Sequence, residues 1–117
     1  PKVLCDTAHN SEGLQIVMQQ LQKQKFDRLH MVIGFVKDKD LNAIFPFLPK
    51  DASYYFCSPA IERGLNEDEL KMKSLDYGFQ GDSYSSVNKA YKQALKMAKA
   101  NDLLYIGGST FVVAEVL

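Results

Sequence analysis

The stretch KVLCDTAHNSEGLQIVMQQL, residues 2–21, changes its pattern of apolar residues halfway along. Residues 2–5, KVLC, are apolar apart from Lys2 and predict a short buried strand. Beyond Ser11, the apolar residues follow the i, i+3, i+4, i+7 spacing of an amphipathic helix: Leu14, Val17, Met18 and Leu21. Asn10 or Ser11 can cap this helix. The stretch therefore predicts a strand that leads through a tight polar turn into a helix, which is the first part of a βαβ unit.

Strand and helix patterns alternate along the rest of the chain. Apolar or aromatic runs predict further strands at 28–34, 53–57, 77–81 and 103–107. Helical spacing and capping signals predict helices from Leu41, over 67–75 and over 84–99, the first of them short because Pro46 and Pro49 interrupt it. The segment 109–117 combines strand-forming β-branched residues with a Ser or Thr helix cap, so both structures remain open.

This order of elements predicts an α/β fold. We expect a single three-layer, Rossmann-like domain over residues 1–117, with a mostly parallel sheet and helices on both faces. The continuous apolar runs HMVIG and LLYIG agree, because strands of a parallel sheet are buried on both sides. The chain opens directly on a strand-like run, from which we expect a domain cut from a longer chain.

Composition argues against several kinds of partner. The 14 basic and 14 acidic residues give no net charge, so no positive field exists to hold a nucleic acid. No apolar run approaches the roughly 20 residues that span a bilayer, and we expect no membrane partner.

Cys5 and Cys57 each end an apolar run outside any C-x-x-C pair, which predicts two buried thiols in a reducing cytoplasm. No histidine pair has metal-ligand spacing, and no metal ligand is predicted in this chain.

Polar clusters follow each of the predicted strands. In chain order they are Asp6-Thr7-Ala8-His9-Asn10, FVKDKD with Lys39, SPAIERG with Arg63, GDSYSS, and Gly107-Gly108-Ser109-Thr110. Ligands of open parallel sheets bind outside the carboxyl ends of the strands, so these clusters should meet at one edge. The helix starts at Asn10 and Ser109 favour phosphate or carboxylate, and Lys39 adds a positive charge. Asp6 instead suits hydroxyls such as a ribose diol, so the edge fits a nucleotide together with a carboxylate compound.

Each cluster also has a structural explanation. Asp6 could accept turn amides, His9 could face solvent, and Ser109 could only cap a helix. A stand-alone nucleotide- or anion-binding module without catalysis therefore remains open, as does a small hydrolase that uses Cys5 or Asp6. The sequence lacks both the G-x-x-x-x-G-K-[ST] loop and a G-x-G-x-x-G turn after a strand.

Three motifs, DTAHN-S-EGL, VIGFVKDKD and GGSTFVVAEVL, together resemble the C-terminal domain of the folylpolyglutamate synthase / dihydrofolate synthase family, part of the Mur ligase superfamily. The resemblance covers essentially the whole chain, although the family usually has Gly and Pro where this chain has Thr7 and Ser11. It implies an ATP-dependent carboxylate–amine ligase. In that reaction ATP phosphorylates a carboxylate of the pterin substrate, and the amino group of glutamate attacks the acyl phosphate to form an amide.

The resemblance also implies roles for individual residues. Asp6, His9 and Asn10 would contact the nucleotide, with His9 as the catalytic residue, and Lys39 and Ser109 would hold the incoming glutamate. ATP and Mg²⁺ would be bound mainly by an N-terminal domain outside this chain, on which the C-terminal domain closes. The expected protein is a cytoplasmic monomer whose isolated C-terminal domain is inactive. Dihydrofolate synthase, folylpolyglutamate synthase and a bifunctional enzyme all remain open, because the pterin site lies outside this chain.

We predict that His9→Ala in the complete enzyme lowers turnover more than it lowers stability. The reason is that the resemblance places His9 at the phosphates or the reacting centre rather than in the core. Turnover and melting temperature of the variant and the wild type are compared. Matching losses in rate and in melting temperature would instead support a structural role for this side chain.

Overall fold

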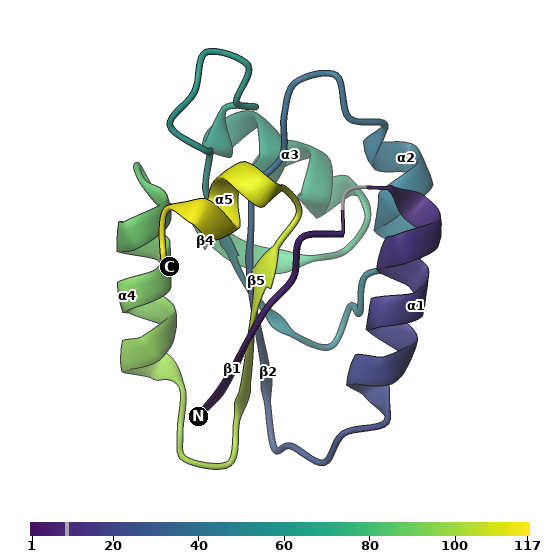
Figure 1. The fold of residues 1–117 in the computed structure, drawn as a ribbon, viewed down its shortest axis with the longest axis vertical. Helices are drawn as coiled ribbons and strands as arrows, with labels where there is room; N and C mark the ends of the chain where they lie inside the picture. Colours follow the sequence, from purple (N-terminus) through teal and green to yellow (C-terminus); the bar gives the residue numbers. More distant parts are fainter. Residues whose placement is uncertain (9) are drawn as a thin grey trace.

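A computed structural model describes residues 1–8 and 10–117 and shows one sheet of five strands in this part of the chain (Figure 1). The strands are β1 (Lys2–Cys5), β2 (Leu29–Ile33), β3 (Ser53–Phe56), β4 (Gln80–Ser83) and β5 (Leu103–Gly107). Their order across the sheet is β1-β5-β2-β3-β4, so the last strand lies between the first two. All neighbouring pairs are parallel, and the predicted α/β class is confirmed.

Helices cover both faces of the sheet, as predicted. One face carries α1 (Ser11–Gln22), α2 (Leu41–Ile44) with the 3-10 turn η1 (Phe45–Phe47), and α3 (Glu67–Asp76); the other carries α4 (Val87–Met97) and α5 (Thr110–Ala114). The crossovers that advance the chain from β1 to β4 place their helices on the first face, and α4, which returns the chain to β5, lies on the second. Right-handed connections require this arrangement. Within the described residues, no helix is long and apolar enough to cross a membrane.

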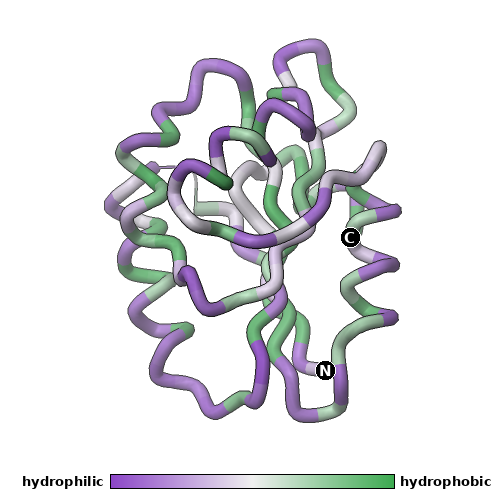
Figure 2. Tube along the Cα trace, turned by 180° about the vertical axis from the view of Figure 1, so that it is seen from behind, coloured by the Kyte–Doolittle hydropathy of each residue, from purple (hydrophilic) through white to green (hydrophobic). Residues whose placement is uncertain are grey.

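The core consists of two apolar layers, one on each face of the sheet. Met31 and Ile33 of β2 join the layer under α1, α2 and α3, whereas Val32 between them joins the layer under α4 and α5. β2 and β5 are buried over their full length because they lie inside the sheet with both faces covered. Figure 2 shows apolar residues along the central strands, while polar and apolar residues alternate along the helices. This is the burial that the runs HMVIG and LLYIG predict.

Capping and proline chemistry set the helix boundaries. The side chain of Asn66 accepts a hydrogen bond from the backbone N–H of Asp68 at 2.9 Å, and Ser86 accepts one from Lys89 at 3.0 Å. Pro46 limits α2 to four residues, after which the chain continues as a 3-10 turn. The segment 109–117, left open by its sequence, contains the helix α5 rather than a strand.

The predicted fourth strand at 77–81 has the wrong bounds. Gly78 has a positive φ of 86°, and the N–H of Phe79 donates to the carbonyl of Ser74 at 3.1 Å. A glycine with positive φ just after the last turn is a common end of a helix. Tyr77 and Phe79 therefore belong to the end of α3 and the turn after it, and not to a strand. β4 therefore begins at Gln80, so part of the polar cluster GDSYSS lies inside the strand instead of after it.

The helix predicted over 84–99 is also shorter than expected. β4 continues to Ser83, and Ser86 then caps a helix that runs from Val87 to Met97. The capping bond explains the late start, because Ser86 is in an extended conformation and cannot belong to the helix.

The prediction that β1 is a buried strand is wrong. β1 lies at the edge of the sheet, where Val3 is 37% exposed and Cys5 is also exposed. α4 packs on β2, β3 and β5, and α5 packs on β5, so β1 lies beyond the helices of that face. Of the two thiols that the sequence predicts to be buried, only Cys57 is.

A buried chain of polar side chains links β2, β3 and the turn before β5. Nε2 of His30 lies 2.9 Å from Oδ2 of Asp102, and Nδ1 of His30 lies 2.8 Å from the hydroxyl of Tyr55. The backbone N–H of Lys99 donates to the same carboxylate at 2.9 Å. This backbone hydrogen bond is the main cause of the lowered pKa of Asp102; burial opposes it, and the hydrogen bond and charge of His30 reinforce it. The ionised carboxylate thus accepts hydrogen bonds from the buried His30 ring and from the partly buried N–H of Lys99.

We predict that Asp102→Ala lowers the free energy of unfolding by about 1–3 kcal/mol at neutral pH, because it leaves His30 and the Lys99 N–H without their acceptor. Chemical denaturation measures the change. Asp51→Ala serves as the matched control, since the Asp51 side chain is 99% exposed and pairs with Arg28 at the surface. Its effect should stay within about 0.5 kcal/mol.

The same variant has a defined pH dependence. The folded-state pKa of Asp102 is lowered from its usual value near 3.8. Its contribution to stability is therefore fully present above about pH 4 and is lost as the pH falls through the folded-state pKa. The stability difference between wild type and Asp102→Ala should shrink below about pH 4. A difference that stays constant down to pH 2 would contradict this account.

Candidate functional site

The carboxyl ends of β1, β5 and β2 lie side by side at one edge of the sheet. Cys5 pairs with Ile106 of β5, and Ile33 of β2 pairs with Gly107. The polar turns that follow these three strands are therefore neighbours in space although they are far apart in the chain (Figure 1). This is the edge at which parallel sheets bind ligands.

Asp6 is held in a fixed orientation at this edge. Its backbone N–H donates to the carbonyl of Ile106 at 2.9 Å, which extends the β1–β5 pairing by one residue. Its Oδ1 accepts the N–H of Ala8 at 3.0 Å, and its Oδ2 accepts the hydroxyl of Tyr105 at 2.7 Å. The turn amide that the sequence suggested as a partner is thus present, but the carboxylate remains half-buried at the surface rather than enclosed.

Tyr105 is a residue that sequence reasoning missed. Burial first, and then the charge and hydrogen bond of Asp6, raise the pKa of the Tyr105 hydroxyl well above its ordinary value. The phenol therefore stays protonated and acts as a permanent donor to Asp6. The only sequence signal is a tyrosine within the otherwise aliphatic run LLYIG. Nothing in that run shows that β5 lies beside β1.

Asn10 caps α1. Its Oδ1 accepts the backbone N–H of Gly13 at 2.7 Å, and its carbonyl accepts the N–H of Leu14 at 3.0 Å. The exposed start of this helix of 12 residues leaves the N–H groups of its first turn at the same edge as Asp6. His9, for which the family resemblance implies a catalytic role, lies outside the described residues.

The turns after β2 and β5 pack tightly against each other. Gly108 has a φ of 95°, and a Cβ atom there would collide with the carbonyl oxygen of Gly34. Only glycine both adopts this positive φ without strain and lacks the Cβ atom that would collide. The close approach brings the loop that follows Gly34 against the start of α5.

A cavity of about 180 Å³ opens between these loops. Lys39 from the loop after β2, Arg63 from the loop after β3 and Ser109 at the start of α5 line it together with Val36, Gly108, Thr110 and Phe111. The structure thus brings together Lys39 and Ser109, which the sequence assigned to one ligand. It adds Arg63, which the sequence noted without a role, and the ring of Phe111, which the sequence did not indicate.

Ser109 serves as a helix cap within this cavity. Its Oγ accepts the N–H of Phe111 at 3.1 Å, and its carbonyl accepts the N–H of Val112 at 3.1 Å. A hydroxyl that accepts one hydrogen bond can still donate its own proton to a ligand oxygen. Capping and ligand binding are therefore compatible, although α5 has only five residues and a correspondingly small dipole.

Cys57 is not suited to nucleophilic chemistry. Burial, and to a smaller extent the charges of Glu115 and Glu67, raise the pKa of its thiol to about 12. Such a thiol is protonated at neutral pH and unreactive. Within the described part of the chain, no group of three or more His, Cys, Asp or Glu side chains could hold a metal ion.

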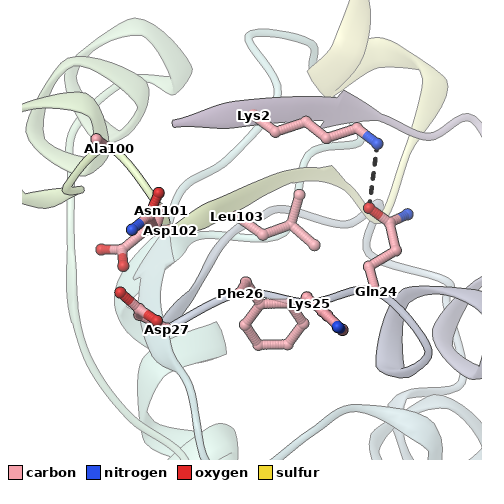
Figure 3. Close-up of a pocket in the computed structure, with 9 residues that line it drawn as sticks. All are labelled: Lys2, Gln24, Lys25, Phe26, Asp27, Ala100, Asn101, Asp102 and Leu103. Atoms are coloured by element: carbon pink, nitrogen blue, oxygen red, sulfur yellow. Dashed lines mark hydrogen bonds between the residues drawn. The ribbon is translucent and has the colours of Figure 1, made fainter.

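A larger cavity, of about 390 Å³, lies at the opposite edge of the sheet (Figure 3). It includes Lys2 and Leu103, the first residues of β1 and β5, and Nζ of Lys2 donates to Oε1 of Gln24 at 3.2 Å. The amino ends of parallel strands are not where these sheets bind ligands, so its size does not make it the functional site.

Comparison with known proteins identifies the family of this chain. Residues 1–110 match the family described as Mur ligase, glutamate ligase domain. The chain is 34% identical over 116 residues to a probable bifunctional folylpolyglutamate synthase/dihydropteroate synthase of Halobacterium salinarum, covering 98% of this chain and 14% of that protein. It is 30% identical over 119 residues to the dihydrofolate synthase/folylpolyglutamate synthase of Escherichia coli, covering 100% of this chain and 27% of that protein.

The fold has a solved counterpart. The structure of Escherichia coli FolC in complex with DHPP and ADP superposes with a TM-score of 0.87 at 30% sequence identity, covering 99% of this chain and 28% of that one. The chain therefore spans little more than a quarter of the FolC chain.

We predict that Tyr105→Phe lowers the free energy of unfolding by about 0.5–1.5 kcal/mol, because it removes the hydrogen bond to Asp6 and keeps the packing of the ring. Thermal or chemical unfolding measures the loss. Tyr77→Phe is the matched control, since its hydroxyl bonds to Asn42 at the exposed surface and should change stability less. Equal effects of the two variants would show that Tyr105 does not hold Asp6.

Proposed function

Because the chain belongs to the glutamate ligase domain family of the Mur ligases, we propose that it is the C-terminal domain of an ATP-dependent ligase. The ligase adds glutamate to dihydropteroate, to folates, or to both. The observation that carries the proposal is the single sheet edge at which a fixed carboxylate and a cavity lined by Lys39, Arg63 and Ser109 lie beside each other. Asp6, Lys39, Arg63 and Ser109 all fall within the matched residues 1–110.

In this proposal Asp6 binds the nucleotide. Each of its carboxylate oxygens accepts one hydrogen bond from the protein, and each has a further lone pair that can accept a ribose hydroxyl. The start of α1, capped by Asn10, offers backbone N–H groups to phosphate. The presence of ADP in the Escherichia coli FolC structure supports nucleotide binding. The role of His9 at the phosphates or the reacting centre rests on the motif match alone.

Glutamate binds in the cavity beside the nucleotide. Lys39 supplies a positive charge for one carboxylate, and the Ser109 hydroxyl donates a hydrogen bond to it. The amino group of glutamate then attacks the activated carboxyl group of the pterin substrate, loses a proton and displaces phosphate, which forms the amide. Enclosure of such a site excludes water, to which an activated acyl group is sensitive.

The domain completes a site that it shares with an N-terminal ATP-binding domain of the same chain. That domain binds most of the ATP and the Mg²⁺, and closure of the two domains assembles the site. The isolated chain of residues 1–117 is accordingly inactive, and the complete enzyme works as a monomer in the cytoplasm.

The test is glutamate-dependent and pterin-dependent release of ADP from ATP by the full-length protein, with the amide product identified by mass spectrometry. We expect no turnover by residues 1–117 alone and only weak binding of ATP or glutamate in calorimetry. Tight ATP binding by the isolated chain would favour a stand-alone binding module instead. Absence of glutamate-dependent ADP release from the full-length protein would overturn the proposal.

Lys39→Ala in the full-length protein should raise the KM for glutamate roughly 10- to 100-fold, because it removes a charged hydrogen-bond donor. The KM for ATP should stay close to its wild-type value. Lys50→Ala, an exposed lysine before β3, is the matched control. A rise in the KM for ATP that equals the rise for glutamate would argue against this division of the site.

A further inference from the structure

Two cations from different loops face the proposed glutamate cavity. Lys39 follows β2, and Arg63 follows β3. A single carboxylate needs only one of them, but glutamate carries two carboxylates. Enclosing the second carboxylate away from water is unfavourable unless a positive group compensates its charge. The pair of cations therefore matches a dicarboxylic amino acid better than a monocarboxylic one.

Backbone pairing fixes the position of Arg63 relative to Lys39. The carbonyl of Arg63 accepts the N–H of Lys37 at 2.7 Å, and Gly64 forms an antiparallel bridge with Val36. The N–H of Lys39 in turn donates to the carbonyl of Val36 at 3.2 Å. The two cationic loops are thus joined through their backbones, which fixes the relative positions of the Lys39 and Arg63 backbones.

The side chain of Arg63 is also supported from the helix side. Its guanidinium carbon lies over the ring of Phe111, 5.8 Å from the ring centroid, within the range of a cation–π contact. Phe111 belongs to the same turn as Ser109 and lines the same cavity. A guanidinium held over a ring still presents its planar fork of N–H groups, which can bind a carboxylate through two hydrogen bonds.

The strand order decides which carboxylate reaches Arg63. Along the edge the order is Asp6 after β1, Ser109 after β5, Lys39 after β2 and Arg63 after β3. The reacting amine must lie toward the nucleotide, and hence toward Asp6. The neighbouring α-carboxylate then lies at Ser109 and Lys39, and the substrate side chain extends toward the guanidinium of Arg63, which lies over the Phe111 ring.

From this arrangement, and on the basis of the proposed function, we propose that Arg63 binds the side-chain carboxylate of the incoming glutamate and sets the preference for a dicarboxylic amino acid. Arg63 is a specificity-determining residue, whereas Lys39 and Ser109 hold the part that all α-amino acids share. Phe111 is a positioning residue that acts through Arg63.

The test compares Arg63→Gln with the wild type in the full-length protein, using L-glutamate and L-glutamine as alternative substrates. Glutamine replaces the side-chain carboxylate by a neutral amide of similar shape. We expect the KM for glutamate to rise roughly 10- to 100-fold with little change in the KM for ATP. The ratio of kcat/KM for glutamate to that for glutamine should fall by a similar factor. Arg63→Lys keeps the positive charge but loses the planar fork of N–H groups, so its KM for glutamate and its kcat/KM ratio should lie between those of the wild type and those of Arg63→Gln.

Arg28→Gln is the matched control. Arg28 is the other arginine of the chain, it lies at the opposite edge of the sheet, and it pairs with Asp51 at 2.8 Å. This control should leave the KM for glutamate and the glutamate-to-glutamine ratio of kcat/KM unchanged. Melting temperatures of all variants separate loss of binding from loss of fold, and Arg63→Lys keeps the test valid if Arg63→Gln fails to fold.

The outcomes separate the two proposals. An active ligase whose glutamate-to-glutamine ratio is the same in Arg63→Gln as in wild type overturns the role of Arg63 and leaves the proposed function intact. Glutamate binding in calorimetry that is lost in Arg63→Gln, without any ligase activity of the wild type, supports Arg63 and overturns the proposed reaction. Failure of the wild type both to bind and to ligate glutamate overturns both.

Discussion

The insertion of β5 between β1 and β2 is the constraint on which the rest of the structure depends. Its parallel pairing on both sides joins the first and last parts of the chain, and it carries the turns after three strands to one edge. The same insertion places the hydroxyl of Tyr105 against the carboxylate of Asp6 and presses Gly108 against Gly34. Without this strand, the nucleotide and glutamate parts of the proposed site would have no fixed relation to each other.

The two edges of the sheet use polar groups in opposite ways. At the amino edge, His30 and Asp102 are buried and bond to each other, so their polarity is satisfied inside the protein and contributes to stability. At the carboxyl edge, Asp6, Asn10 and Ser109 bond to backbone or side-chain donors but retain capacity for a further partner. This contrast favours the carboxyl edge, rather than the larger cavity at the amino edge, as the candidate site. A ligand site needs oriented polar groups that can still form a hydrogen bond to the ligand, and the volume of a cavity does not show whether such groups are present.

The proposed glutamate cavity combines a rigid frame with an open side. Backbone bonds between the Val36 and Arg63 loops join the two loops that carry the cations, and the Phe111 ring supports the guanidinium. Lys39 and Arg63 nevertheless lie at the surface of a single domain that spans about a quarter of the Escherichia coli FolC chain. A charged substrate in such a place is exposed to water until a second surface covers it, which is the physical reason for assigning closure to another domain.

The sequence by itself determined the α/β class, the strand–helix alternation and the polar turns after the strands, because apolar periodicity and capping are local properties of the chain. It also showed Asp6, Lys39 and Ser109 as candidates. Two predictions from the sequence were wrong: that the fourth strand begins at residue 77, and that β1 and Cys5 are buried. The end of a helix and the place of a strand at the sheet edge depend on residues distant in the chain, which local patterns do not contain. Only the tertiary structure decided that β5 lies beside β1, that Tyr105 holds Asp6, and that Arg63 and Phe111 share a cavity with Lys39. These are contacts between residues distant in the chain, and they follow from the order of strands in the sheet.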